Sequence, residues 1–269
     1  MSRLLFTGER LHADDPLFAI DLVRHRAAYA FALSMAKAEE HASILDLGCG
    51  TGYGAQELAE ALPRVFAVDR IAPDAAARHP QCTFVRADAA HLPLREASFD
   101  MVVSFQVIEH LDDPGPYLKA VAGLLRPGGV ALLSTPNRLE SDGENPFHVR
   151  EYEAGELTPL LGRYFGAVEM LGVSATPGPK AYYDARLRRI RTIVRLDPLR
   201  LRERLPRWLV DRLFAALAVV VRKGIARGEG LPPADLEDFP IRTAEPECLD
   251  LLAVCRGPGT TPTPGGEGP

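Results

Sequence analysis

Residues 44–54 read ILDLGCGTGYG, an apolar strand-like run that breaks into a loop with a glycine at every second position. Glycine adopts positive φ freely and lets a ligand approach the bare backbone. A helical pattern follows over residues 55–62. The first turn of such a helix offers unpaired N–H groups and a positive dipole end to an anion. The stretch therefore predicts a cofactor bound at the end of a strand.

The spacing of the glycines separates several kinds of nucleotide loop. No lysine follows Gly52 or Gly54, so the loop lacks the GxxxxGK[ST] pattern of a P-loop. The spacing GxGxGxG also differs from the dinucleotide fingerprint GxGxxG. Asp46 stands two positions before the first glycine, and the resulting pattern DxGxGxG resembles the first motif of class I S-adenosylmethionine-dependent methyltransferases. This resemblance implies that the loop lies against the methionine part of the cofactor and that Asp46 orders the loop and contacts the amino group.

Two further strand-like runs end in carboxylates. Residues 64–69 read RVFAVD and end in Asp69, about twenty residues past the first glycine. A carboxylate there suits both hydroxyls of a ribose, in a methyltransferase and in a dehydrogenase alike. Residues 82–89 read CTFVRADA. The resemblance implies that Asp88 accepts a hydrogen bond from the adenine amino group, although an aspartate at a strand end is also a common helix cap.

A fourth block favours the methyltransferase class over the dehydrogenase class. Residues 98–111 read SFDMVVSFQVIEHL, a strand-like run that leads into a polar cluster. A helical pattern over 114–125, the turn LRPGG at 125–129 and an apolar strand over 130–134 follow. Proline would stop the helix and the two glycines would allow the reversal. FDxV followed by LxPGG and a strand is similar to the second half of a class I methyltransferase core.

The alternation of strand and helix patterns predicts an α/β fold with a doubly wound, mostly parallel sheet. The resemblance spans about residues 20–175 and implies a seven-stranded, Rossmann-like methyltransferase sheet. Its last strand, near residues 249–255, is expected to run antiparallel between the fifth and the sixth. A helix over residues 21–37 is expected to precede the first strand. Within it, Tyr29 or Arg26 would reach the methionine carboxylate, or Tyr29 would pack into the core.

The domain organisation follows from length and composition. One methyltransferase domain is expected over residues 1–256, with a helical basic insertion at 175–240. Residues 257–269 are almost all Gly, Pro and Thr and are predicted to be disordered. The four cysteines show no metal-ligand spacing, and neither an apolar leader nor a bilayer-spanning stretch is present. These features predict a cytoplasmic protein.

The insertion carries an unusual charge. Residues 180–227 contain fourteen Lys and Arg against four Asp and Glu, whereas the whole chain has a net charge of −5. An apolar run over 208–221 is flanked by Arg207, Arg222 and Lys223. Such a basic amphipathic segment can lie on the inner face of a membrane or collect a phosphorylated or lipid-linked substrate. A lid, a homodimer helix or a simply solvated face are the alternatives, and scarce aromatic residues disfavour nucleic acid.

The candidate catalytic residues are Glu109 and His110, just beyond the fourth strand, and His148 in NPFHVREY at 145–152. Methyl transfer to oxygen is an in-line displacement that requires alignment and removal of a proton from the acceptor. An imidazole suits general-base duty near neutrality. The string QVIEHL followed by STPNR resembles O-methyltransferases of ubiquinone biosynthesis and a group that acts on sugars and other natural products. In this interpretation Glu109 orients His110, and His148 is a second base or binds substrate.

A metal site is the alternative for the same three residues. The pattern ExxEH with a later His binds a divalent metal in bacterial small-RNA 2′-O-methyltransferases and some quinone enzymes, which the sequence resembles. Here Gln106 replaces the first Glu. A carboxamide is a weaker ligand for a hard cation than a carboxylate is, so a metal held by Glu109, His110 and His148 is not favoured. Gln106 is instead expected to contact the cofactor.

The sequence thus predicts an S-adenosylmethionine-dependent methyltransferase that forms S-adenosylhomocysteine and O-methylates a small molecule such as a sugar, a quinone-like compound or another natural product. N- and C-methylation stay open. An NAD(P) oxidoreductase and a non-catalytic cofactor-binding or membrane-docking module are the other classes. The predicted cofactor residues are Tyr29, Asp46, Gly48, Cys49, Gly50, Gly52, Asp69, Arg70, Asp88, Ala89 and Gln106.

Overall fold

The computed structural model describes residues 16–73, 78–89, 91–141, 145, 147–195, 216, 220–225 and 231–258. Its helices are α1 (Ala19–Ala38), α2 (Tyr53–Ala61), α3 (Pro114–Leu124), α4 (Ala154–Leu161) and α5 (Pro177–Arg195), with short 3₁₀ turns η1 (Pro16–Phe18), η3 (Ile108–His110), η4 (Arg138–Glu140) and η5 (Leu236–Asp238). Its strands are β1 (Ile44–Leu47), β2 (Val65–Asp69), β3 (Cys82–Arg86), β4 (Phe99–Phe105), β5 (Leu125–Pro136), β6 (Phe165–Val173), β7 (Ile241–Thr243) and β8 (Asp250–Pro258).

The described strands form one sheet in the order β3-β2-β1-β4-β5-β8-β6-β7. Strands β1 to β5 run parallel, and β8 lies antiparallel between β5 and β6, as the sequence predicts. The sheet has eight strands rather than the predicted seven, because β7 adds a short antiparallel edge to β6. This strand has only three residues, which is too short for an alternating pattern to reveal it.

Strand β5 also begins earlier than expected. The predicted reversal at 125–129 belongs to β5, and the register against β4 shifts between its first pair and Met101. Gly128 has φ 82°, a conformation that glycine adopts without strain. The glycines therefore accommodate an irregularity within the strand instead of only a turn before it.

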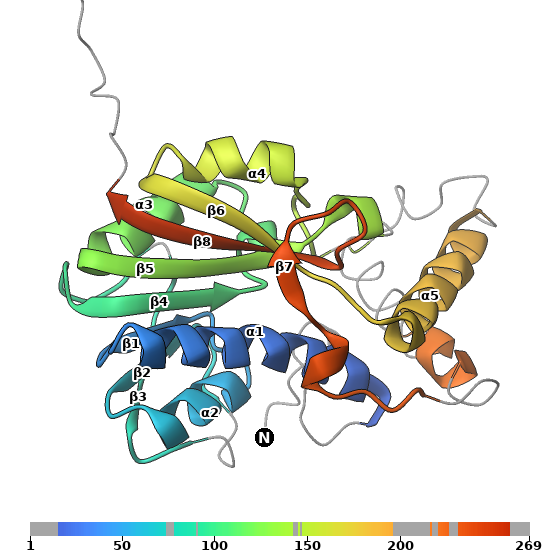
Figure 1. Cartoon of the computed structure of the whole chain (residues 1–269), viewed down its shortest axis with the longest axis horizontal. Helices are drawn as coiled ribbons and strands as arrows, with labels where there is room; N and C mark the ends of the chain where they lie inside the picture. The colour runs from blue at the N-terminus through green and yellow to red at the C-terminus, as the bar shows by residue number, and fades with distance from the viewer. Residues whose placement is uncertain are drawn as a thin grey trace, which may run out of the picture.

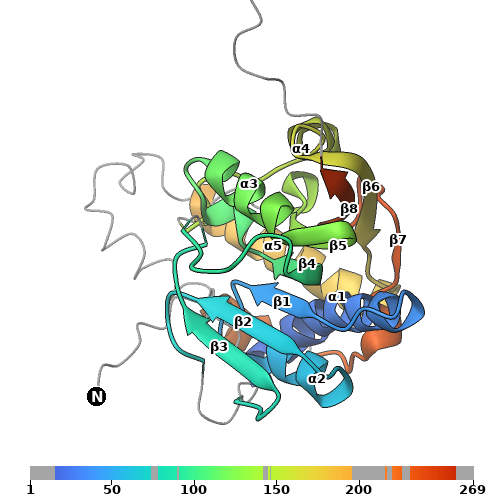
Figure 2. The same cartoon turned by 90° about the vertical axis from the view of Figure 1, so that its left-hand side faces the viewer.

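Helices cover both faces of the sheet (Figures 1 and 2), where α3 and α4 lie on one face and α1 and α2 on the other. Neighbouring residues of one strand serve opposite cores: Leu45 packs with the α3 and α4 side, and Ile44 with the α1 and α2 side. This is the burial expected of parallel strands covered on both faces.

The chain order reverses at β1, because β2 lies on one side of this strand and β4 lies on the other. Ligands of doubly wound folds bind at the carboxyl ends of the strands at such a point. The glycine loop after β1 and the QVIEH segment after β4 both lie there. The fold therefore brings the two most informative sequence motifs to one edge.

Only part of the basic insertion can be described. Helix α5 opens it, and residues 220–225 are helical, while 196–215, 217–219 and 226–230 lie outside the described residues, as does the tail beyond 258. Gly257 and Pro258 belong to strand β8. Most of the apolar run at 208–221 lies outside the described residues, so its predicted amphipathic helix stays a prediction. Within the described part of the chain, no helix combines the length and apolar composition that a bilayer crossing requires.

Candidate functional site

The glycine loop has the backbone that its sequence demands. Gly48, Gly50 and Gly52 have φ of 86°, 58° and 95°. A Cβ at Gly48 would lie 2.4 Å from the Val107 side chain, so the loop packs tightly against the segment after β4. A Cβ at Gly50 would meet nothing within 4 Å. The backbone at Gly50 is therefore open to a ligand, which fits a cofactor cradle.

The side chain of Cys49, in contrast to the open backbone at Gly50, points into the protein core. Its side chain is 3% exposed and packs with Ala55 and Ala67. Its N–H donates to the Val68 carbonyl over 3.1 Å, and its carbonyl accepts from Gly52 N–H over 2.9 Å. Cys49 therefore acts as a small packed residue that fixes the loop.

Asp46 and Tyr29 form a buried pair beneath the loop. The Tyr29 hydroxyl donates to the Asp46 carboxylate over 3.1 Å, and the two residues are 5% and 0% exposed. Burial raises the pKa of Asp46 to about 7, although the hydrogen bond from Tyr29 lowers it. The Tyr29 ring packs edge-on against Phe105, so the second expectation, packing into the core, describes its position.

The carboxylate of Asp69 lies at the end of β2, where it meets the glycine loop. It accepts from the N–H of Gly50 over 2.9 Å and from that of Ile71 over 2.9 Å. Asp69 thus holds the glycine loop, and its contact with a ribose stays a prediction. Arg70 is exposed next to it, and its carbonyl accepts from the Arg86 side chain.

Asp88 and Ala89 follow the end of β3. Asp88 is exposed and forms an isolated bridge with His91, whose N–H donates to the Asp88 carbonyl over 3.0 Å. Ala89 is partly buried against the core of the α3 side. The parallel pairing of β2 and β3 brings these residues to the same edge as Asp69.

Gln106 has an unusual backbone for a residue with a side chain. Its φ is 57°, in the left-handed region that glycine favours, and such residues often mark functional sites. Its N–H donates to the Ser134 carbonyl over 2.9 Å, and its side-chain amide lies 3.4 Å from the Ser134 hydroxyl. Gln106 is therefore fixed just after β4, against the neighbouring strand β5.

The turn η3 contains both Glu109 and His110, and the two side chains lie in different surroundings. Glu109 is 0% exposed, and its carboxylate accepts from the Thr135 hydroxyl over 3.0 Å. His110 is half-buried, and its Nδ1–H donates to the Phe147 carbonyl over 2.9 Å. That bond orients the ring and leaves the lone pair of the neutral imidazole on Nε2.

The loop that carries His148 fixes the second imidazole. His148 Nδ1–H donates to Glu151 over 2.7 Å, and the Asn145 side-chain amide donates to His148 Nε2 over 2.9 Å. The backbone N–H of Phe147 donates to the side-chain oxygen Oδ1 of Asn145, and this bond sets the orientation of the side-chain amide. The N–H of Val149 donates to the Glu109 carbonyl over 2.7 Å and thus docks this loop on η3.

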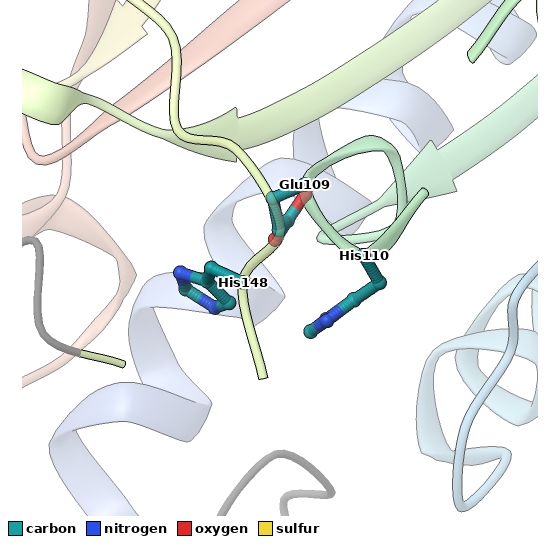
Figure 3. Close-up of side chains that lie close together, drawn as sticks. All are labelled: Glu109, His110 and His148. Atoms are coloured by element: carbon teal, nitrogen blue, oxygen red, sulfur yellow. The ribbon is translucent and has the colours of Figure 1, made fainter. Parts of the chain in front are cut away.

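Glu109, His110 and His148 come together although the third lies far along the chain (Figure 3). One ligand atom from each lies within 4.8 Å of the others, which is a spacing suited to a divalent ion. Two imidazoles and a carboxylate suit transition metals. A metal at His148 Nε2 would have to displace the Asn145 amide, so the set fits a metal only after rearrangement.

Several residues of this site escape sequence reasoning. Thr135 holds Glu109, Asn145 and Glu151 hold His148, and the Phe147 carbonyl orients His110. The spacing HxxE of His148 and Glu151 is a signal that could have identified one of them. The others depend on contacts between β4, β5 and the following loop.

The amino-acid sequence is similar to known methyltransferases. Residues 45–133 match a family model described as a methyltransferase domain. A Mycolicibacterium smegmatis protein named as a probable S-adenosylmethionine-dependent methyltransferase is 45% identical over 152 residues, which are 53% of this chain and 59% of that protein. A Mycobacterium tuberculosis protein of the same description is 40% identical over 166 residues, 59% of this chain and 60% of its own length. The chain thus spans about three fifths of these relatives.

Two further proteins are similar to this chain, one over part of its sequence and one in its fold. A ubiquinone biosynthesis O-methyltransferase of Caulobacter vibrioides is 36% identical over 107 residues, 37% of this chain and 42% of that protein. The crystal structure of a S-adenosylmethionine-dependent methyltransferase of Thermotoga maritima has a TM-score of 0.55 at 18% identity and covers 89% of this chain and 91% of its own. The structural similarity concerns the fold.

Proposed function

We propose that this chain, which carries a class I S-adenosylmethionine-dependent methyltransferase domain, O-methylates a small molecule with His110 as the general base. When bound, S-adenosylmethionine supplies a methyl group activated on a sulfonium. The open glycine loop and Asp69 support this cofactor. The similarity to ubiquinone O-methyltransferases over 107 residues supports oxygen as the acceptor atom. Sugars, quinone-like compounds and other natural products are the proposed acceptors.

The observation that carries the role of His110 is the hydrogen bond from its Nδ1–H to the Phe147 carbonyl. Because that bond places the proton of the neutral imidazole on Nδ1, the lone pair on Nε2 can accept the proton of an acceptor hydroxyl. The acceptor oxygen forms its bond to the methyl carbon as the sulfur–methyl bond breaks, and the proton ends on Nε2. Glu109, buried under the turn, stabilises the imidazolium that results.

The cofactor claim is tested by isothermal titration with S-adenosylhomocysteine. We expect the wild-type protein to bind it and Asp69→Ala to weaken it by roughly 10- to 100-fold, since a hydrogen bond to a charged group contributes about 1.5–3 kcal/mol. Asp112→Ala, at an exposed position, is the matched control. A folded wild-type protein without affinity would refute the proposal.

The base assignment is tested by turnover, followed as release of S-adenosylhomocysteine with methyl glycosides and catechols as acceptors. We expect His110→Asn to lower kcat by roughly 10²–10⁴-fold, the usual contribution of a general base. His148→Asn, which keeps a hydrogen-bonding side chain in the neighbouring loop, should reduce kcat less. Full turnover in His110→Asn would remove His110 from the mechanism.

Divalent-metal assistance is the second candidate function, because Glu109, His110 and His148 offer ligand atoms within 4.8 Å. A bound ion would supply Lewis-acid stabilisation of the acceptor oxygen. Titration with Mn²⁺ alone tests it: one site in the wild-type protein that is lost in His148→Ala would favour the metal. If the wild-type protein gives no heat of binding with Mn²⁺, the metal-assisted function is excluded and the general-base mechanism remains. Contact of residues 180–227 with a membrane, a lipid-linked substrate or a second copy stays a prediction.

A further inference from the structure

Three arginines from separate segments converge on one buried carboxylate. Asp21, in α1, is 3% exposed. It accepts from Arg186 Nη1 in α5 over 3.1 Å and from Arg222 Nη2 over 3.0 Å, and Arg24 Nη2 lies 4.0 Å away. Although burial opposes ionisation, these guanidinium groups hold the pKa of Asp21 far below its usual range. Asp21 is therefore a permanent anion at the centre of the cluster.

A second acid contributes less negative charge. Asp250, the first residue of β8, is 3% exposed, and its Oδ2 lies 3.4 Å from Arg24 Nε. Burial raises the pKa of Asp250, and the charge of Arg24 opposes that rise. Among the described residues, three guanidinium charges thus face at most two carboxylate charges. The cluster carries an excess of at least one positive charge.

Such an excess is unfavourable when little water reaches it. Buried charges in proteins are paired, and a buried donor without an acceptor costs about 1–3 kcal/mol. Within the described part of the chain, Nε of Arg222 is buried without a hydrogen bond, and Nε of Arg24 has only the Asp250 carboxylate at 3.4 Å. The side chains of Arg24, Arg186 and Arg222 nevertheless keep 12%, 20% and 12% of their surface exposed. A small anion can therefore reach them and complete the charge balance.

The cluster lies on the edge of the sheet where ligands bind. Asp250 pairs with Pro136, the last residue of β5. The side chain of Gln106, which directly follows β4, acts to lower the pKa of Asp250, so the two residues are neighbours at this edge. Figure 1 shows α5 beyond the end of β5 and β8 at which these residues lie, beside the N-terminal part of α1. The excess charge thus adjoins the predicted methyl-transfer site.

We propose that Arg24, Arg186 and Arg222 bind an acidic group, a carboxylate or a phosphate, of the methyl acceptor. This inference rests on the proposed function and narrows its substrate class to anionic small molecules. The cofactor also carries a carboxylate. Competition between phosphate and S-adenosylhomocysteine therefore has to distinguish the acceptor from the cofactor. Planar guanidinium groups suit bidentate contacts with both acidic groups.

Calorimetric titration with inorganic phosphate tests the site without knowledge of the acceptor. We expect the wild-type protein, saturated with S-adenosylhomocysteine, to bind phosphate, and Arg222→Met to weaken that affinity about tenfold or more. Arg186 stays within 3.1 Å of Asp21 in this variant, so the carboxylate keeps a partner. Lys223→Met, at the exposed neighbouring position, is the control and should leave phosphate affinity unchanged.

Each outcome decides the proposal. Absence of phosphate binding by the wild-type protein, or equal affinity in Arg222→Met, would overturn it. Competition between phosphate and S-adenosylhomocysteine, with both weakened in Arg222→Met, would assign the arginines to the cofactor carboxylate and also overturn it. Failure of the wild-type protein to bind S-adenosylhomocysteine would refute the proposed function separately. Circular dichroism of Arg222→Met checks the fold, and Arg222→Lys, which keeps the charge, should retain part of the affinity.

Discussion

At the residue scale, Asp46 shows how burial changes a group that the sequence identifies only by its place before the glycines. The side chain is fully buried, and its main partner is the Tyr29 hydroxyl. Burial raises its pKa to about 7, and the charge of Asp69 adds to the rise. Near neutral pH the carboxyl is therefore partly protonated in the free protein, and a cationic ligand nearby would favour its ionised form.

The raised pKa predicts a pH-dependent stability. Because the pKa of Asp46 is higher in the folded protein than in the unfolded chain, its contribution is fully present below about pH 4 and is lost as the pH rises to about 7. The Asp46→Asn variant does not lose stability in this way, because its amide does not ionise. We expect its free energy of unfolding, relative to wild type, to increase between pH 5 and pH 8, by at most about 4 kcal/mol.

Urea unfolding at both pH values, without ligand, measures this difference. Asp112→Asn, at an exposed position, should show the same pH dependence as the wild-type protein. A difference between Asp46→Asn and wild type that stays constant with pH would contradict the raised pKa.

At the scale of elements, helix α2 packs over α1 at a single glycine. A Cβ at Gly54 would lie 2.0 Å from Cζ of Tyr29, well inside van der Waals contact. The hydroxyl of the same tyrosine, in α1, donates a hydrogen bond to Asp46 in β1. The last glycine of the motif is thus required for packing between helices, whereas Gly48, Gly50 and Gly52 are required for their backbone angles.

We therefore expect Gly54→Ala to lower the free energy of unfolding by about 1–3 kcal/mol, the usual cost of overpacking. Gly155→Ala, in α4, is the control: its Cβ would meet nothing within 4 Å. That substitution should stabilise the protein by about 0.4–1 kcal/mol, since it restricts the unfolded chain. Thermal unfolding of both variants measures the effects, and equal melting temperatures would contradict the packing argument.

At the scale of the whole molecule, a charge network ties the basic insertion to the rest of the fold. Asp21 in α1 joins α5 and residues 220–225 through Arg186 and Arg222. The ring of Phe18 lies 4.4 Å from the Arg222 guanidinium and reinforces the contact. The described parts of the insertion are therefore anchored against α1.

Loss of Asp21 should release this anchor. We expect Asp21→Ala to destabilise the protein by about 3–5 kcal/mol, because buried arginines lose their partner. Asp184→Ala removes a 2.7 Å ion pair with Lys180 at a side chain that is 38% exposed, and it should cost less than about 1 kcal/mol. Urea unfolding compares the two. Similar losses would show that the network adds nothing to stability.

The fold could be predicted in large part because its signals are local. The glycine loop is one short segment, and each strand-like run together with the carboxylate at its end spans about ten residues or fewer. The antiparallel last strand came from the resemblance alone. Strand β7 was missed because three residues carry no periodic pattern, and the early start of β5 was missed because an irregular strand reads as a turn.

The sequence by itself determined the class of fold and the glycine loop, because glycine backbone angles and acids at strand ends are local requirements. It also offered Glu109, His110 and His148 as candidates, whose roles stay predictions. Tertiary structure decided the partners. Tyr29 meets Asp46 across 17 residues, and Arg222 meets Asp21 across 201. From the composition of the insertion alone, Arg186 and Arg222 are expected on a basic surface. In the structure both donate hydrogen bonds to the buried carboxylate of Asp21. Only the packing of α1 against α5 and the sheet removes water from these groups, and desolvation sets their chemistry.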